Sequence, residues 1–484
     1  MDNRSITRDT MLFLPAKILE GLVGILTLSY ISHAITTGGV DTFGSVNTIV
    51  SFSYLLLISY LTNSAARYVA EETREDERRR SFFSTCSLIW VFTNILVYIL
   101  VIPLKAFGVK HVAAVACMFT ANSLYQLTLS MLVQVGKKKE SIALSLISAI
   151  LKPALIFTAC HIMGSGQQDT ALPAIASFVA AELLCGIIGV FLLRIPRNFS
   201  FKAYSGSLAA KLFRYGIPLM GVSLSVGLLN VVDRFVIIFF GEDFAVYYTN
   251  NTISSSVFTM LMIGIMRAVY PSILKAYREE GFERAQSVVD GSVRMYLLVA
   301  MPACAGLIGI SRSLSALLFE ESYVWGHPII ALSAVAMFFT GFTEYAIKAW
   351  ELRGDTKPIM QNALISVVVK VVCTVMLLPV LGVFGAGVSS IISFSLYFVI
   401  SSLRAKKIFL FRLPLKRLLS ILIPSLLCMA VSYIVSTAVP GRLLGVALSV
   451  FAGIAIYGLA LALSGEVKQE ISMIKGKLSK FKDK

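Results

Sequence analysis

Apolar runs of about twenty residues recur along the whole chain and are separated by short polar stretches. A helix needs about 20 mostly apolar residues to cross the hydrocarbon core of a membrane. Because a backbone inside a membrane must satisfy its own hydrogen bonds, these runs predict helices, and the chain is expected to be an all-α polytopic membrane protein. We predict fourteen spans, over residues 11–35, 42–66, 82–103, 112–135, 142–163, 170–193, 212–239, 244–270, 293–319, 328–350, 358–379, 385–403, 415–438 and 443–463.

The composition agrees with this pattern. Hydrophobic residues make up 57% of the 484 residues and charged residues only 14%, with a mean hydropathy of +0.80. Soluble domains average about 45–50% apolar and about 25% charged residues. No polar segment is left over that is long enough to fold as a soluble domain. The sequence therefore excludes a soluble enzyme.

The basic residues predict the orientation in the membrane. Most Lys and Arg lie at the two ends and in the loops after even-numbered spans, whereas the other loops hold only Lys105, Lys110 and Arg442. Cytoplasmic loops carry the excess of basic residues, so both termini are expected to be cytoplasmic. This bias explains the net charge of +16 without a nucleic-acid partner.

One stretch occurs twice. Residues 136–154 recur without a gap at residues 354–372, so that Gly136 matches Gly354 and Lys152 falls on Lys370. This match predicts two six-helix repeats, which an even number of spans places in the same orientation. The expected organisation is an N-terminal bundle at 1–200, a C-terminal bundle at 201–404, an additional helix pair at 405–464 and a cytoplasmic amphipathic basic tail at 465–484.

Ionisable residues inside spans are costly and indicate functional candidates. The spans contain more cations (Lys17, Lys152, Arg234, Arg267, Arg312, Lys348, Lys370) than acids (Glu20, Glu182, Asp233, Glu344). Lys17 with Glu20 and Glu344 with Lys348 have the spacing of same-face helical pairs. Lys152 and Lys370 have no acid on their own helix, so the surplus favours binding of an anion such as a phosphate or diphosphate. The alternative is that these lysines pair with Glu182 or Glu20 only to hold helices together.

The sequence does not indicate an enzyme. The chain has no Gly-x-x-x-x-Gly-Lys-Ser/Thr loop, no Gly-x-Ser-x-Gly elbow and no His-Glu-x-x-His motif. Its cysteines and histidines lack the spacing of metal ligands, so neither a metal nor a cofactor is expected. Any transport must then be driven by a gradient of ions or of substrate.

The two repeats, the additional helix pair, the basic N-terminal segment and the Gly-(Lys/Asp)-(Lys/Thr)-Lys turns at 136–139 and 354–357 resemble the multidrug/oligosaccharidyl-lipid/polysaccharide exporter superfamily. Within it, the chain is most similar to the Wzx-type polysaccharide flippases, such as those for O-antigen. The resemblance covers residues 1 to about 404, and the last helix pair agrees with the fourteen-span members.

The resemblance implies a flippase that moves an undecaprenyl-diphosphate-linked oligosaccharide to the outer leaflet by alternating access, coupled to an ion gradient. Membrane lipids and a polysaccharide polymerase or assembly complex are the implied partners. The positions that suit the anionic substrate are Lys17, Arg67, Lys152, Arg267 and Lys370, and those that suit ion coupling are Glu20, Asp233 and Glu344. The alternatives are a lipid II flippase and a drug antiporter of the same superfamily. A glycan polymerase or ligase is disfavoured because it needs a sizeable external loop, and a membrane scaffold because it leaves the deep lysines unexplained.

Overall fold

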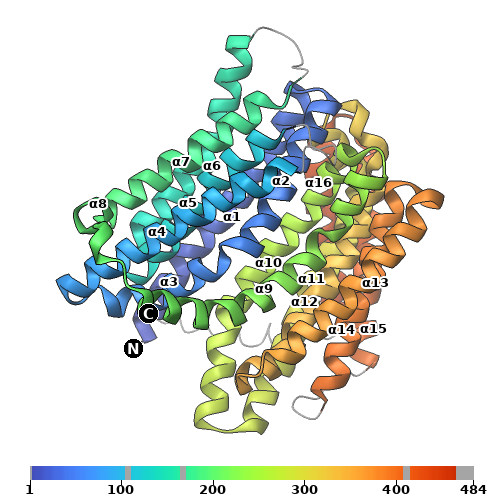
Figure 1. Ribbon diagram of the computed structural model, residues 1–484. Helices are drawn as coiled ribbons and strands as arrows, with labels where there is room; N and C mark the ends of the chain where they lie inside the picture. Colours follow the sequence, from blue (N-terminus) through green and yellow to red (C-terminus); the bar gives the residue numbers. More distant parts are fainter. Residues whose placement is uncertain (1–2, 104–110, 164–169, 407–414, 465–484) are drawn as a thin grey trace, which may run out of the picture. The chain divides into compact units, whose positions relative to one another are not determined.

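The computed structural model describes residues 3–103, 111–163, 170–406 and 415–464, and in these ranges it contains helices and no strands (Figure 1). The long helices are α1 (Asn3–Ala34), α2 (Thr37–Leu57), α4 (Asp76–Val101), α5 (Val112–Gln134), α6 (Lys138–Met163), α7 (Leu172–Leu192), α9 (Gly206–Phe240), α10 (Phe244–Glu279), α11 (Phe282–Leu318), α12 (Pro328–Arg353), α13 (Lys357–Leu381), α14 (Val383–Ala405), α15 (Leu415–Ala438) and α16 (Arg442–Ser464). The short ones are α3 (Ser59–Glu72), α8 (Ile195–Asn198), η2 (Phe201–Ala203) and η3 (Glu321–Gly326). Thirteen described helices are long and apolar enough to cross a membrane, and the 32-residue α1 covers the first predicted span. The predicted all-α membrane fold is confirmed.

The second predicted span, 42–66, is not one continuous helix. It is divided at Ile58, whose backbone (φ −135°, ψ −18°) leaves the helical region between α2 and α3. Neither glycine nor proline marks the break, and Leu and Ile surround it, so the hydrophobic pattern runs through it unchanged. The apolar pattern therefore gives no signal of the break between α2 and α3.

The two glycines that open the repeated stretch adopt the same conformation. Gly136 has φ +87° and Gly354 has φ +71°, values that glycine reaches without steric cost. In the first turn the N–H of Lys137 donates to the carbonyl of Leu132 (2.9 Å), and in the second the N–H of Asp355 donates to that of Trp350 (3.1 Å). Both turns are Schellman motifs, which end one helix so that the next can begin. The match between the two sequence stretches therefore extends to the backbone conformation at these turns.

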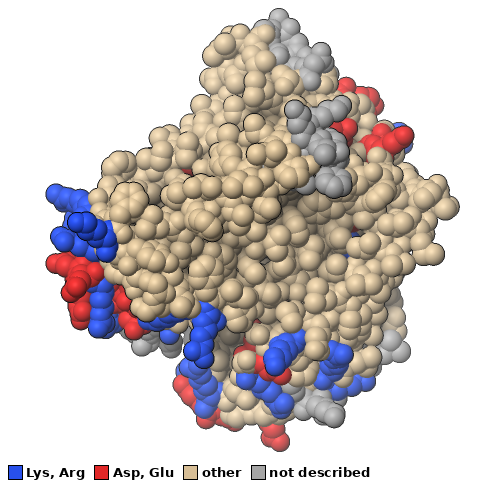
Figure 2. Space-filling model, viewed as in Figure 1, with Lys and Arg blue, Asp and Glu red and all other residues tan. Residues whose placement is uncertain are grey.

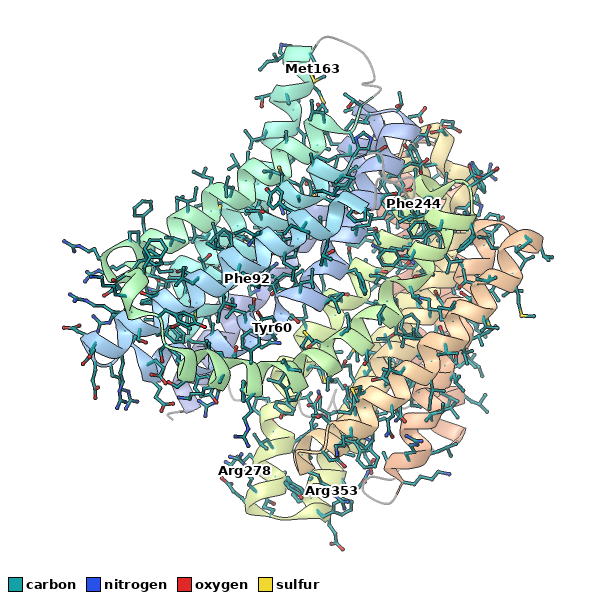
Figure 3. The ribbon with its side chains drawn as sticks, in the orientation of Figure 1. Tyr60, Phe92, Met163, Phe244, Arg278 and Arg353 are labelled. Carbon is teal, nitrogen blue, oxygen red and sulfur yellow. The ribbon has the colours of Figure 1, made fainter. Side chains whose placement is uncertain are left out.

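Two helices extend well beyond their predicted spans. α10 has 36 residues and α11 has 37. The extension of α10 carries the same-face ion pair Lys275–Glu279 (3.7 Å), and Arg284 of α11 pairs with Glu280 in the turn between the two helices (3.2 Å). Figure 3 shows Arg278 near the end of α10 and Arg353 at the end of α12, at the same end of these helices. Charged pairs at helical spacing stabilise such polar extensions.

The chain forms two compact units. Unit 1 comprises residues 1–248 and 356–386, and unit 2 comprises residues 249–355 and 387–484. The helices α9 and α13 of the second sequence half thus belong to unit 1. The predicted domains at 1–200, 201–404, 405–464 and 465–484 follow the sequence repeat and not the contacts between helices, so they stay a prediction. The last of them, 465–484, lies outside the described residues.

Each unit has close helix contacts that the sequence pattern alone does not show. In unit 1, a Cβ atom on Gly216 of α9 would lie 2.3 Å from the carbonyl oxygen of Tyr60 on α3, so only glycine permits this approach. In unit 2, the ring of Tyr296 on α11 packs against Phe338, Phe342 and Tyr345 of α12 at centroid distances of 5.2–5.9 Å. Aromatic pairs of this kind stabilise a core beyond the area they bury.

Charged residues are confined to the ends of the helices on the face shown in Figure 2. In unit 1, Lys and Arg gather at the end that carries α8 and the start of α4. The surface between this end and the other end of unit 1 is almost free of charge. This distribution is typical of a protein surrounded by lipid.

Candidate functional site

The first lysine of the repeat lies in an ionic centre of unit 1. The ammonium of Lys152 on α6 is 2.7 Å from the Oε1 atom of Glu182 on α7. The second carboxylate oxygen of Glu182 accepts a hydrogen bond from the side-chain amide of Asn122 on α5 (3.1 Å). The side chain of Lys152 is 18% exposed and that of Glu182 is 5% exposed. The helices α5, α6 and α7 therefore meet at one ion pair, in which the lysine side chain stays partly exposed.

The second lysine of the repeat is enclosed completely. The ammonium of Lys370 on α13 is 3.1 Å from the Oδ2 atom of Asp233 on α9, and it donates to the carbonyl of Leu229 (2.8 Å). The phenol of Tyr247, at the start of α10, donates to the same carboxylate oxygen. The side chains of Lys370 and Asp233 are 1% and 3% exposed. This centre joins α9, α10 and α13.

Aromatic rings connect the two centres. The ammonium of Lys152 lies 4.5 Å from the centroid of the Phe178 ring. The Phe178 ring contacts Phe43 of α2 (5.0 Å), and Phe43 contacts Tyr248 (6.5 Å). The guanidinium of Arg234, which follows the aspartate of the second centre, lies 5.2 Å from the Tyr248 ring. Cations over aromatic faces are attracted by the ring quadrupole, so the bridge stabilises both ends.

The predicted same-helix ion pairs are confirmed. Lys17 and Glu20 of α1 are 2.7 Å apart, with side chains 37% and 32% exposed. In unit 2, Lys348 of α12 contacts Glu344 at 3.5 Å, and it contacts Glu351 more closely, at 2.8 Å. Glu351 lies beyond the predicted end of the span, yet its spacing of three residues from Lys348 was a signal that could have found it.

Of the two predicted arginines, the structure describes the side chain of Arg67, which contacts neither centre in the described part of the chain. Arg67 is exposed on α3, with its guanidinium 5.8 Å from the ring of the neighbouring Tyr68. Arg267 belongs to α10, but its side chain lies outside those that the structure describes. The described aromatic contacts between the centres run from Lys152 to Arg234, the sequence neighbour of Asp233, and they include neither Lys17 nor Arg67.

Several residues of the site carried no signal in the sequence. Asn122, Phe178, Phe43 and Tyr247 are ordinary residues of apolar helices, and their contacts join different helices. Glu182 was weighed as a partner of Lys152, whereas the pairing of Asp233 with Lys370 was not foreseen. Contacts between helices depend on packing, which a periodic pattern does not specify.

The chemistry of the two lysines differs. An ammonium group has three N–H donors, and Lys152 directs one of them to Glu182 within the described residues. Because part of this side chain is exposed, a phosphate oxygen that reached it could accept a further hydrogen bond. The enclosed ammonium of Lys370 is not accessible in this conformation.

Two family models match the chain. The model for "Polysaccharide biosynthesis protein" matches residues 6–276, and the model for the lipid II flippase MurJ matches residues 219–452. No curated protein matches the chain.

Solved structures show the same fold at low sequence identity. A lipid II flippase MurJ in an inward closed conformation is similar with a TM-score of 0.75 and 14% identity, over 96% of this chain and 100% of the other. An inward-facing multidrug resistance MATE family transporter of the MOP superfamily is similar with a TM-score of 0.66 and 13% identity, over 82% and 98%. A MOP superfamily transporter from Pyrococcus furiosus is similar with a TM-score of 0.58 and 12% identity, over 83% and 96%. The chain therefore has the fold of this superfamily.

Proposed function

Because the chain belongs to the polysaccharide biosynthesis protein family, we propose that it flips an undecaprenyl-diphosphate-linked oligosaccharide from the inner to the outer leaflet of the cytoplasmic membrane. Transport proceeds by alternating access, and both termini are cytoplasmic. The protein acts as a transporter and not as an enzyme, beside a polymerase or assembly complex that uses the flipped lipid.

The observation that carries this proposal is the partly exposed side chain of Lys152. Its ammonium pairs with Glu182 through one N–H, and the other N–H donors suit the diphosphate. Lys17, also partly exposed, adds a second cation in the same unit. The helix that carries Lys17, α1, packs against α6, which carries Lys152, so the two cations lie on neighbouring helices. The enclosed Lys370 is reached only in another conformation, and Arg267 stays a predicted substrate residue.

Coupling to an ion gradient needs a carboxylate that exchanges its cation. Glu20 and Glu344 are the better candidates, since their side chains are 32% and 34% exposed. Asp233 is held by Lys370 and Tyr247, so it takes part only if the ammonium of Lys370 moves away. A proton or a sodium ion satisfies this requirement equally.

The experiment is a profile of lipid-linked intermediates in cells depleted of the protein, with re-expression of the wild type as the control. We expect an oligosaccharide-diphosphate-lipid to accumulate on the cytoplasmic face, because its synthesis continues while its export stops. Its mass identifies the cargo. An unchanged profile would contradict the proposal.

The second candidate function is a lipid II flippase. It is favoured by the match of the MurJ model to residues 219–452 and by the similar fold of MurJ. The same profile separates the two, because accumulation of the peptidoglycan precursor supports the lipid II cargo. Increased drug sensitivity without any accumulated lipid would instead support a drug antiporter, the activity named for the similar multidrug resistance transporter.

A further inference from the structure

A groove of about 860 Å³ lies in unit 1, away from the ionic centres described above. Its walls are apolar and come from α2, α3, α4 and α9. Figure 3 labels two of its lining residues, Tyr60 at the start of α3 and Phe92 in the interior of α4. The side chains of Phe92 and Ile95 on α4 are 68% and 52% exposed, so the groove is open at its α4 side. None of the charged residues of the candidate site lines it.

The groove is built by particular features of the chain. At Ile58 the helix path breaks, which places Leu56 and Leu57 of α2 and Tyr60 of α3 on the same wall. The Tyr60 ring stacks on Phe213 of α9 at 4.9 Å, beside the close approach at Gly216. These contacts hold α3 and α9 together, and α4 packs against both of them.

One end of the groove is closed by the segment between α8 and α9. The N–H of Ser200 donates to the hydroxyl of Ser84 (2.9 Å), and the N–H of Ser205 donates to that of Thr85 (3.1 Å). Both acceptors are on α4, so the segment is fixed against this helix. Its residue Tyr204, which is 50% exposed, then lines the groove.

Three exposed cations are close in sequence to lining residues of the groove. Lys202 precedes Tyr204 by two residues, and Arg214 directly follows the lining residue Phe213. Arg67 lies seven residues after Tyr60, which places it on the same side of α3 two turns further along. In the described part of the chain none of these three side chains forms an ion pair, in contrast to Lys211, which is bound by Glu72 (2.6 Å). An apolar groove whose lining residues have exposed cations close in sequence complements an amphiphile with an anionic head.

We propose that this groove binds a membrane phospholipid with an anionic headgroup, its acyl chain along α4 and its phosphate among Lys202, Arg214 and Arg67. The bound lipid connects α3, α4 and α9 across the break at Ile58. A resident phospholipid is favoured over the cargo because the groove lies apart from Lys152 and Lys370 and opens at an apolar surface. This site does not depend on the identity of the cargo.

The test is native mass spectrometry of the full chain purified in detergent and titrated with dioleoylphosphatidylglycerol or dioleoylphosphatidylcholine. We expect the wild type to retain one phosphatidylglycerol molecule in preference to phosphatidylcholine. The double variant K202Q/R214Q should bind phosphatidylglycerol about 25-fold more weakly, at about fivefold for each cation removed. Its matched control is Arg353→Gln, which removes an exposed cation from the end of α12 in unit 2 and should leave this binding unchanged.

A second variant tests the groove itself. Leu88→Trp places a large ring inside it and should abolish retention of the lipid, whereas Ile150→Trp, on the exposed face of α6, should not. Equal binding of the two phospholipids, or wild-type binding by both Leu88→Trp and K202Q/R214Q, would overturn the proposal. Undecaprenyl phosphate that binds in place of phosphatidylglycerol would show that the occupant is the cargo lipid instead.

Discussion

Lys152 and Lys370 occupy matching positions on α6 and α13, but unit 1 encloses them to different degrees. Lys152 is 18% exposed and shares Glu182 with Asn122. Lys370 is 1% exposed and holds Asp233 together with Tyr247. A buried ammonium without its carboxylate is very costly, so Lys370 must keep its partner in this conformation. The less enclosed lysine is free to gain a second partner, and this difference suits Lys152 for a ligand and Lys370 for holding helices.

The largest expected effect is on the enclosed pair. Lys370→Met leaves the Asp233 carboxylate buried without an ammonium, and we expect a loss of about 3–5 kcal/mol in the free energy of unfolding. Unfolding by denaturant in detergent micelles measures it. The double variant D233L/K370M should recover most of this loss, because the uncompensated charge is gone. A single variant as stable as the wild type would contradict the structural role.

Substitution of the partly exposed lysine should affect transport more than stability. Lys152→Gln removes a charge-assisted interaction worth about 1.5–3 kcal/mol, so we expect lipid export to fall about ten- to a hundredfold. The amount of protein in the membrane should remain close to that of the wild type. Export is measured as the lipid-linked oligosaccharide on each face of membrane vesicles.

The control for this prediction is Lys152→Arg, which keeps the charge beside Glu182 and should retain part of the export. Normal export in the double variant K152A/K370A would show that neither lysine contributes to the substrate path.

The aromatic bridge gives a smaller effect that tests whether the two centres are coupled. Phe43→Leu keeps most of the volume but loses the ring contacts to Phe178 and Tyr248, and we expect a cost of about 1–1.5 kcal/mol. If the bridge positions Lys152, the losses of export in F43L and K152Q should not add in the double variant. Additive losses would show that the bridge and the lysine act independently.

The smallest effect is expected at the most exposed pair. Lys17→Gln breaks an ion pair whose side chains are 37% and 32% exposed, and such pairs contribute about 0–1 kcal/mol. The melting temperature in detergent should therefore change by less than for any variant above. A marked decrease in export at an unchanged melting temperature would assign Lys17 to the substrate path.

The fold was largely predictable from the sequence, but one feature was not. The lengths of the apolar runs reproduce the long helices, and the repeated glycines Gly136 and Gly354 end helices in the same way. The break at Ile58 was missed because it occurs inside an apolar run without glycine or proline. Hydropathy reports whether residues prefer lipid, and it does not report the direction of the backbone.

The candidate site was predictable only where partners share a helix. The spacing of Lys17 with Glu20 and of Glu344 with Lys348 determines their separation, because an α-helix fixes the geometry of neighbouring turns. The pairs Lys152–Glu182 and Lys370–Asp233 join different helices, and their distances depend on how those helices pack.

The sequence by itself determined the membrane fold, the repeated stretch and the presence of lysines inside the spans, because these follow from local composition and spacing. The tertiary structure decided that one repeated lysine is enclosed and the other is partly open, and that an apolar groove is lined by Tyr60, Tyr204 and Phe213. The physical reason is that the burial of a side chain, and the fit of a groove to a ligand, depend on several packed helices together. Residues far apart in the chain, such as Tyr60 and Phe213, create them only when the helices are packed.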